Sequence, residues 1–152
     1  MHKLSPKQVY ENYAAQGLYE EADFDEDEVR KVIQMTNEDY DFTQRIKKDK
    51  NPSWRVIFNA YYDAFRELCD QLMRFKKQKS SNHQAVFAFI IINFKELYFD
   101  WELLEQIRNT RNNNKYKGLD ISQQMWKSVE IHFEVYITSL RKELEKILEE
   151  SR

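Results

Sequence analysis

The run from Trp54 to Phe75 constrains the fold more than any other part of the sequence. Its large apolar residues recur at steps of three and four, which is the spacing of one wide face of an α-helix. They are Trp54, Phe58, Tyr61, Tyr62, Phe65, Leu68, Cys69, Leu72 and Phe75. A helix with so wide an apolar face must be covered by other elements. We therefore predict a core helix here, in which Tyr61 and Tyr62 serve packing and not base stacking.

The composition favours helices throughout. The chain has 2 glycines and 2 prolines among 152 residues, and 33% of its residues are charged. These values suit long helices better than a β architecture with many tight turns. We predict an all-α, up-and-down helical bundle of about five helices in a single domain over residues 1–152. Within it, residues 1–50 form an N-terminal helical extension and residues 51–152 form the core bundle.

Two helices are expected before the core helix. Ser5 followed by Pro6 is a strong helix start, and this first helix should run to about Tyr19. Asp25 has the position of an N-cap, and the acidic residues that follow it suit the positive end of a helix dipole. The apolar stripe of this second helix is thin, so we expect the helix to be peripheral or to break near Thr36–Asn37.

After the core helix, Ser81 or Asn82 can cap a helix that opens at His83. Apolar residues then continue to Ile107, which predicts one long helix or two helices on a shared axis. Gly118 is the expected stop, because glycine adopts the left-handed conformation at little cost.

The last helix is expected to begin near Asp120, with Gln123 as its capping-box partner. His132 lies within this helix among apolar neighbours and is interpreted as a structural histidine.

Several chemistries are excluded by missing residues. Two isolated glycines cannot form a P-loop or a dinucleotide fingerprint, and the three histidines lack the spacing of metal ligands. Asp63 and Glu67 share a helix face but are read as solvated, so we expect no metal and no cofactor. A single cysteine, Cys69, and the lack of a signal peptide favour a cytoplasmic protein. The longest apolar run, Ala85–Ile92, is too short to span a bilayer, so no membrane partner is expected.

The stretch Arg108–Gly118 is too polar for a simple connector. It carries four bases, four asparagines, no acid and no aliphatic side chain. Basic side chains bind phosphates, and asparagines donate and accept hydrogen bonds beside them. The predicted RNA- or nucleotide-binding residues are Arg108, Asn109, Arg111, Asn112, Lys115 and Lys117, with Asn113 beside them. The alternative is that these side chains bond across a dimer and cap the helix end.

His83 also has two interpretations. It stands at a helix start beside a basic turn, where an imidazole can reach a phosphate or a partner chain. The other interpretation gives it a local capping or interface role.

Three pieces of the sequence resemble the HEPN family, the small helical domains of prokaryotic toxin–antitoxin pairs, defence systems and some nucleotide-handling assemblies. Phe58–Leu68 is similar to the Tyr-Tyr-centred core helix of that family. Lys79–His83 is similar to its Ser/Asn-His turn, and Arg108–Gly118 stands where its functional motif begins. The resemblance runs from about Trp54 to the end of the chain. It implies a homodimer with the polar stretch at or near the subunit junction, and a small nucleotidyltransferase antitoxin as a further partner.

In family members that cleave RNA, the resemblance implies an arginine, usually followed by a polar residue, and a histidine four to six positions later. Arg108 and Asn109 fit the start of this motif, but Lys115 and Tyr116 stand where the histidine is expected. Metal-free cleavage needs proton transfer near neutral pH, which suits imidazole at about 6.5. An unperturbed lysine at about 10.4 or tyrosine at about 10 is poorly matched to this task.

We therefore predict a non-catalytic protein that binds RNA, a nucleotide or a partner protein through this Arg/Asn-rich groove. Two alternatives stay open. One is a metal-independent endoribonuclease of the toxin–antitoxin or defence type, in which Arg108 and Asn109 act with Lys115, Tyr116 or His83. The other is a structural adaptor with no nucleic-acid role.

Overall fold

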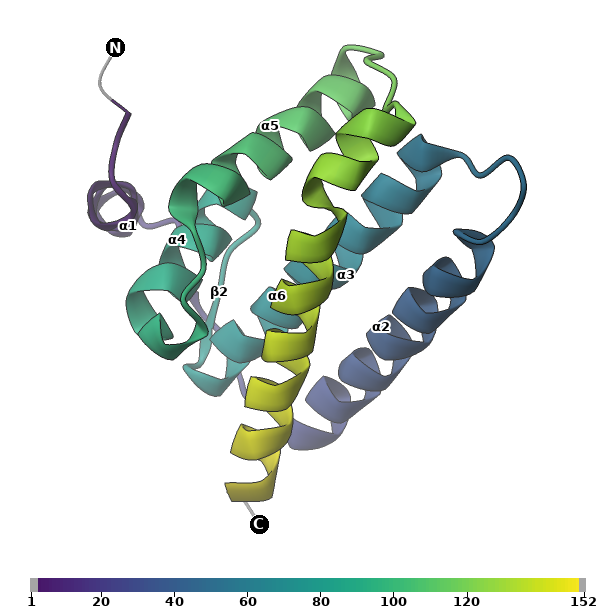
Figure 1. The fold of residues 1–152 in the computed structure, drawn as a ribbon. Helices are drawn as coiled ribbons and strands as arrows, with labels where there is room; N and C mark the ends of the chain where they lie inside the picture. The colour runs from purple at the N-terminus through teal and green to yellow at the C-terminus, as the bar shows by residue number, and fades with distance from the viewer. Residues whose placement is uncertain (1–2, 151–152) are drawn as a thin grey trace.

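The computed structural model describes residues 3–150 and contains six α-helices and one short antiparallel ribbon in that range (Figure 1). The α-helices are α1 (Pro6–Ala15), α2 (Glu26–Ile46), α3 (Trp54–Phe75), α4 (His83–Asn93), α5 (Trp101–Tyr116) and α6 (Gln123–Glu150). A 3-10 turn, η1 (Lys95–Leu97), lies between α4 and α5, and strands β1 (Glu20–Glu21) and β2 (Gln78–Lys79) form the ribbon. The predicted all-α helical bundle is confirmed.

Helix α3 is the centre of the bundle, as its periodicity predicts. It packs against α2, α4, α5 and α6, and in Figure 1 α6 crosses in front of it while α1 and α2 lie at opposite edges. Tyr61 and Tyr62 are both fully buried, at 0% exposure, which confirms their packing role. Trp126 of α6 meets Tyr61 edge-on, with 4.7 Å between ring centroids. Burying a side chain of this size contributes roughly 1.5–3 kcal/mol.

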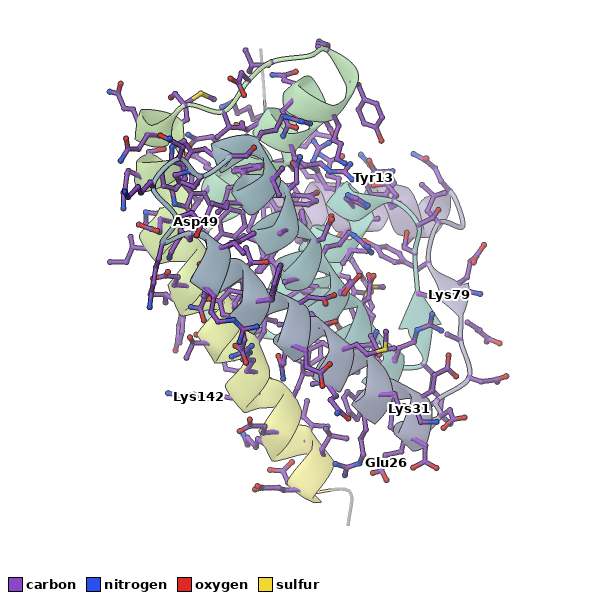
Figure 2. The ribbon with its side chains drawn as sticks, turned by 90° about the vertical axis from the view of Figure 1, so that its right-hand side faces the viewer. Tyr13, Glu26, Lys31, Asp49, Lys79 and Lys142 are labelled. Carbon is purple, nitrogen blue, oxygen red and sulfur yellow. The ribbon has the colours of Figure 1, made fainter. Side chains whose placement is uncertain are left out.

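Helix α4 is apolar on all sides. Every residue from 85 to 90 is buried, so the helix requires cover from several directions. Helix α1 packs along one side of it, and the hydroxyl of Tyr19, which follows α1, donates to the Ala85 carbonyl over 2.7 Å. The ribbon lies at the same edge as α1: in Figure 2, Tyr13 and Lys79 lie on one side of the molecule and Lys142 of α6 on the other.

The first helix is shorter than expected, and the second lies at the edge of the bundle, as one of its two alternatives predicted (Figure 1). Helix α1 ends at Ala15, not near Tyr19, because Gly17 turns the chain with a φ of 73°. Helix α2 is continuous through Thr36, which is only 2% exposed. The Thr36 hydroxyl donates to Glu67 Oε2 over 2.7 Å, so this polar residue is satisfied by α3 and the helix does not break.

The expected shared axis of the next two helices was also wrong. Gln84 Nε2 at the start of α4 donates to Glu105 Oε2 in α5 over 3.0 Å. On a shared axis these residues, 21 positions apart, would lie about 30 Å from each other. The chain instead reverses after η1, where Tyr98 takes a left-handed conformation with a φ of 54°. Asp100 then caps α5 by accepting from the N–H of Glu102 over 2.9 Å.

The last helix begins slightly later than expected. Asp120 Oδ1 accepts from the neighbouring N–H of Ile121, and the N-cap is Ser122, whose Oγ accepts from the Met125 N–H over 3.1 Å. His132 is exposed on α6, so its interpretation as a structural core histidine was wrong. The two-stranded ribbon had not been expected.

Candidate functional site

Most of the polar stretch forms the C-terminal half of α5. The helix continues through it to Tyr116, and Gly118, with a φ of 70°, ends it as predicted. The carbonyl of Asn113 accepts from the N–H groups of both Lys117 and Leu119. Helical spacing therefore sends the side chains of this stretch to different faces, and only some of them can share a site.

One hollow of about 240 Å³ lies between the start of α4 and the last turns of α5. Its lining residues are Ser81, Asn82, His83, Gln84, Arg108, Arg111, Asn112 and Tyr116. Five of these were predicted as site residues: His83, Arg108, Arg111, Asn112 and Tyr116. Two chain segments that are well separated in sequence therefore meet at this hollow. We call this hollow the α4/α5 hollow.

The remaining predicted residues lie outside the α4/α5 hollow. Asn109 and Asn113 line a separate groove beside α1. Lys115 and Lys117 are exposed and do not line the hollow. Arg108, Arg111 and Asn112 thus line the hollow, whereas Lys115 and Lys117 add positive charge to the surface outside it.

Arg108 is already engaged. Its Nε and one terminal nitrogen donate to the two carboxylate oxygens of Glu105 over 3.2 and 3.0 Å. This two-pronged geometry is the strong form of an arginine–carboxylate pair. Arg108 therefore contributes a fixed charge that is largely balanced by its neighbour.

Arg111 has no such partner. Its guanidinium lies 5.2 Å from the Tyr62 ring centroid and 6.0 Å from that of Tyr116. Its Nε is buried and makes no hydrogen bond, and within residues 3–150 the side chain forms no ion pair. A buried N–H without an acceptor is costly, by roughly 1–3 kcal/mol. Arg111 is thus a cation held in place by two aromatic rings, with hydrogen-bonding capacity left over.

His83 is hydrogen-bonded to the core helix. Its Nδ1 lies 2.9 Å from the Tyr62 hydroxyl. Burial, and then the positive charges of Arg66, Arg111 and Arg108, lower the pKa of His83 to about 4, while burial raises the pKa of Tyr62. The hydroxyl thus keeps its proton and can donate it to Nδ1, which leaves Nε2 as an N–H donor. His83 is a neutral hydrogen-bonding group at pH 7.

Arg66 of α3 also acts electrostatically on His83, although the sequence did not mark it as a site residue. It lies one helical turn after Tyr62, acts on the pKa of both Tyr62 and His83, and is paired with Asp70. Its position four residues after a core tyrosine, on the flank of the apolar face, was the available signal. Three arginines from two helices therefore act on His83, and two of them are paired with the carboxylates of Glu105 and Asp70.

The position of α5 is fixed by a pair of buried amides that sequence reasoning also missed. Asn59 Nδ2 donates to Asn114 Oδ1 over 3.1 Å, and Asn114 Nδ2 donates back to Asn59 Oδ1 over 2.9 Å. The two residues are 9% and 4% exposed. Because Asn114 lies one turn after Arg111, this pair holds the site-forming part of α5 against α3.

The opposite pKa shifts of His83 and Asp70 predict opposite effects on acid stability. Between pH 6.5 and about 4 the unfolded chain protonates His83 while the folded protein does not, so His83 lowers the free energy of unfolding as pH falls. Burial raises the pKa of Asp70 from 3.8 to about 6. The folded protein therefore holds a proton there that the unfolded chain has released, and this stabilisation is lost as pH rises to about 6.

We expect His83→Gln to reduce the loss of stability between pH 7 and pH 4.5 by about 1 kcal/mol, after allowing for solvent screening. Asp70→Asn should increase that loss by a similar amount. Urea unfolding of both variants at the two pH values measures this. Equal pH dependence of His83→Gln and the unaltered protein would contradict the assignment.

No family model, no curated protein and no solved structure matches this chain. In residues 3–150 no group of three or more His, Cys, Asp or Glu side chains is placed to hold a metal ion. No helix in the same range is both long and apolar enough to span a membrane. The function must therefore be argued from the α4/α5 hollow itself.

Proposed function

We propose that this protein binds the phosphate group of a nucleotide, either in RNA or free, at the α4/α5 hollow without cleaving it. The observation that carries the proposal is the guanidinium of Arg111, which lines the hollow and, within residues 3–150, has no carboxylate partner. A phosphate supplies the missing partner, because its oxygens accept several hydrogen bonds from a planar guanidinium and its charge balances the cation.

The neighbours of Arg111 suit the same ligand. Asn112 lines the hollow and supplies a neutral amide, and His83 supplies an N–H donor at Nε2. Tyr116 is 76% exposed, and its ring lies 6.0 Å from the guanidinium, which it helps to hold in place. The hollow therefore combines a held cation with hydrogen-bond donors within reach of one phosphate.

The same geometry argues against cleavage. With a pKa of about 4, His83 carries a proton on only about one molecule in a thousand at pH 7, and its neutral form is a weak base. Lys115 lies outside the hollow. The hollow is thus equipped to hold a phosphate but not to move protons to and from it.

The proposal also covers the family of the chain and its assembly into a dimer. We propose that the chain is HEPN-like and cytoplasmic, and that two copies meet near α5, which would place two Arg111 sites close together. A nucleotidyltransferase antitoxin is the partner that this family would supply. The order of the core helix, the Ser/Asn-His turn and Arg108-Asn109 supports this proposal.

We expect Arg111→Met to weaken binding of a short labelled single-stranded RNA or of AMP at least tenfold, since a charge-assisted hydrogen bond contributes about 1.5–3 kcal/mol. Arg111→Lys keeps the charge but not the planar donors and should be intermediate. Arg55→Met, which removes an exposed arginine of α3, is the matched control. Fluorescence anisotropy for RNA and calorimetry for AMP give the affinities.

If Arg55→Met weakens binding as much as Arg111→Met does, binding depends on general surface charge and not on the hollow, and the proposal is overturned. The same RNA, incubated with the protein in chelator, should stay intact. Cyclic-phosphate-ended fragments that disappear in Arg108→Ala would establish the ribonuclease alternative. If neither RNA nor AMP binds at all, the adaptor alternative replaces the proposal.

A further inference from the structure

A second and larger hollow is also lined in part by α5. It is a groove of about 920 Å³ between the first residues of α1 and the length of α5. Its lining residues are Lys3, Leu4, Ser5, Pro6, Gln8, Val9, Gln84, Asp100, Trp101, Glu102, Glu105, Gln106, Asn109, Thr110 and Asn113. We call it the α1/α5 groove. Its volume matches that of pockets that hold small organic ligands.

The wall contributed by α5 is a row of free amides. Gln106, Asn109 and Asn113 are spaced three and four residues apart, so they lie along one face of the helix. In residues 3–150 none of these three side chains makes a hydrogen bond. Each amide offers a carbonyl acceptor and two N–H donors. The wall is thus suited to a flat polar group with its own donors and acceptors.

The charge of the α1/α5 groove is the reverse of that of the α4/α5 hollow. Asp100, Glu102 and Glu105 line it, although Glu105 is paired with Arg108, and the one cationic lining residue is Lys3. A phosphate is repelled by such a lining, whereas the exocyclic amine of a base finds acceptors there. The two hollows therefore favour the two different parts of a nucleotide.

The two hollows are also neighbours. Asn112 lines the α4/α5 hollow and Asn113, the next residue, lines the α1/α5 groove. Gln84 lines both of them, accepting from the Tyr13 hydroxyl over 2.6 Å and donating to Glu105 over 3.0 Å. The two hollows therefore share Gln84 of α4 and adjoin along α5.

We propose that the α1/α5 groove holds the base of the nucleotide whose phosphate lies at Arg111, and that it selects bases with an exocyclic amine over uracil. This inference rests on the proposed function. Asparagine and glutamine pair with adenine through both edge groups, and a carboxylate accepts from the amine of cytosine. Uracil offers a carbonyl at the corresponding position, which the carboxylate of Glu102 disfavours because an ionised carboxylate only accepts hydrogen bonds.

CMP and UMP test this inference most directly, because they differ at that position of the base. We expect the unaltered protein to bind CMP about tenfold more tightly than UMP, as one well-placed base contact discriminates by roughly that factor or more. Glu102→Gln, which replaces the carboxylate by an amide that can also donate, should bind the two about equally. Its affinity for ribose 5-phosphate, which has no base, should be unchanged. Calorimetry measures all three ligands.

The matched control is Glu149→Gln, which makes the same change at an exposed carboxylate of α6 and should keep the preference for CMP. Short oligocytidylate and oligouridylate are compared in the same way. A preference that is present in the oligonucleotides, together with tighter binding, assigns the site to RNA. A preference confined to the mononucleotides assigns it to a free nucleotide.

Equal binding of CMP and UMP by the unaltered protein, or a preference that survives in the groove variant, overturns the base site. In either case binding of ribose 5-phosphate shows that the phosphate site itself stands. If ribose 5-phosphate and both nucleotides fail to bind, the proposed function and this inference fall together.

Discussion

Asn59→Leu should destabilise the folded protein by about 3 kcal/mol. Leucine has nearly the shape of asparagine, so little packing is lost, but Asn114 is left with a buried amide and no partner. Asn59 and Asn114 each donate one hydrogen bond and accept one, and both bonds disappear together. Urea unfolding of the purified variant gives the free energy of unfolding.

The double variant Asn59→Leu with Asn114→Leu separates this explanation from a simple packing defect. Replacing both members of a buried polar pair by apolar groups of similar shape can be nearly neutral, so the double variant should recover most of the loss. Asn113→Leu, which alters an amide with no hydrogen bond on the same helix, should change stability by no more than about 0.5 kcal/mol. A double variant as unstable as the sum of the singles would refute the account.

Lys47→Met should cost about 2–3 kcal/mol for a different reason. The Lys47 ammonium contacts Glu130 at 3.0 Å and Glu134 at 2.8 Å and donates to the Tyr61 hydroxyl over 3.1 Å. Burial alone would lower the pKa of Lys47, but the hydrogen bonds with Glu134, Tyr61 and Glu130 raise it above its ordinary value. Removing the ammonium leaves two partly buried carboxylates next to each other.

The adjacent Lys48 is the matched control, because it forms no ion pair in the described part of the chain. Lys48→Met should stay within about 0.5 kcal/mol of the unaltered protein. Adding Glu134→Gln to Lys47→Met should restore part of the stability by removing the repulsion between the carboxylates. Unfolding in urea at pH 7 decides the matter, and equal costs for Lys47→Met and Lys48→Met would refute the proposed network.

The parts of the fold that depend on local signals could be read from the sequence. The bounds of α3 follow from its apolar period, and Ser5, Asp25 and Asn82 each cap the helix that they precede. Gly118 ends α5 as expected. Each of these features depends on residues within one or two helical turns, which is the range over which sequence patterns carry information.

The errors arose where the outcome depended on distant contacts. The reversal between α4 and α5 contains neither glycine nor proline, and it requires Tyr98 to adopt a left-handed conformation that few non-glycine residues take. Asp100 was a visible N-cap signal that had been passed over. Thr36 looked like a helix breaker because its partner, Glu67, lies on another helix.

The residue types of the candidate site could be predicted, but not which of the residues lie together in the hollow. The bases and asparagines of α5 looked equivalent in sequence, yet Arg111 is held between two rings, Asn114 is buried against Asn59 and Lys115 is exposed. Helical spacing separates neighbours onto different faces, and which face meets which helix is decided by the packing of α3, α4 and α5. Arg66 was missed because it belongs to a different helix from the basic stretch.

Helix α1 covers the apolar surface of α4, and this contact links ligand binding to the solubility of the protein. Only Val9 of α1 is buried, and the hydroxyls of Tyr13 and Tyr19 bond to Gln84 and Ala85, so detaching this segment costs less than opening the core. Opening would bring the apolar surface of α4 into water, where it can associate with other molecules. A ligand in the α1/α5 groove would contact both α1 and α5 and so oppose the detachment of α1 from α4. Under the proposed binding mode, the ligand-free protein is more prone to aggregation than the ligand-bound protein.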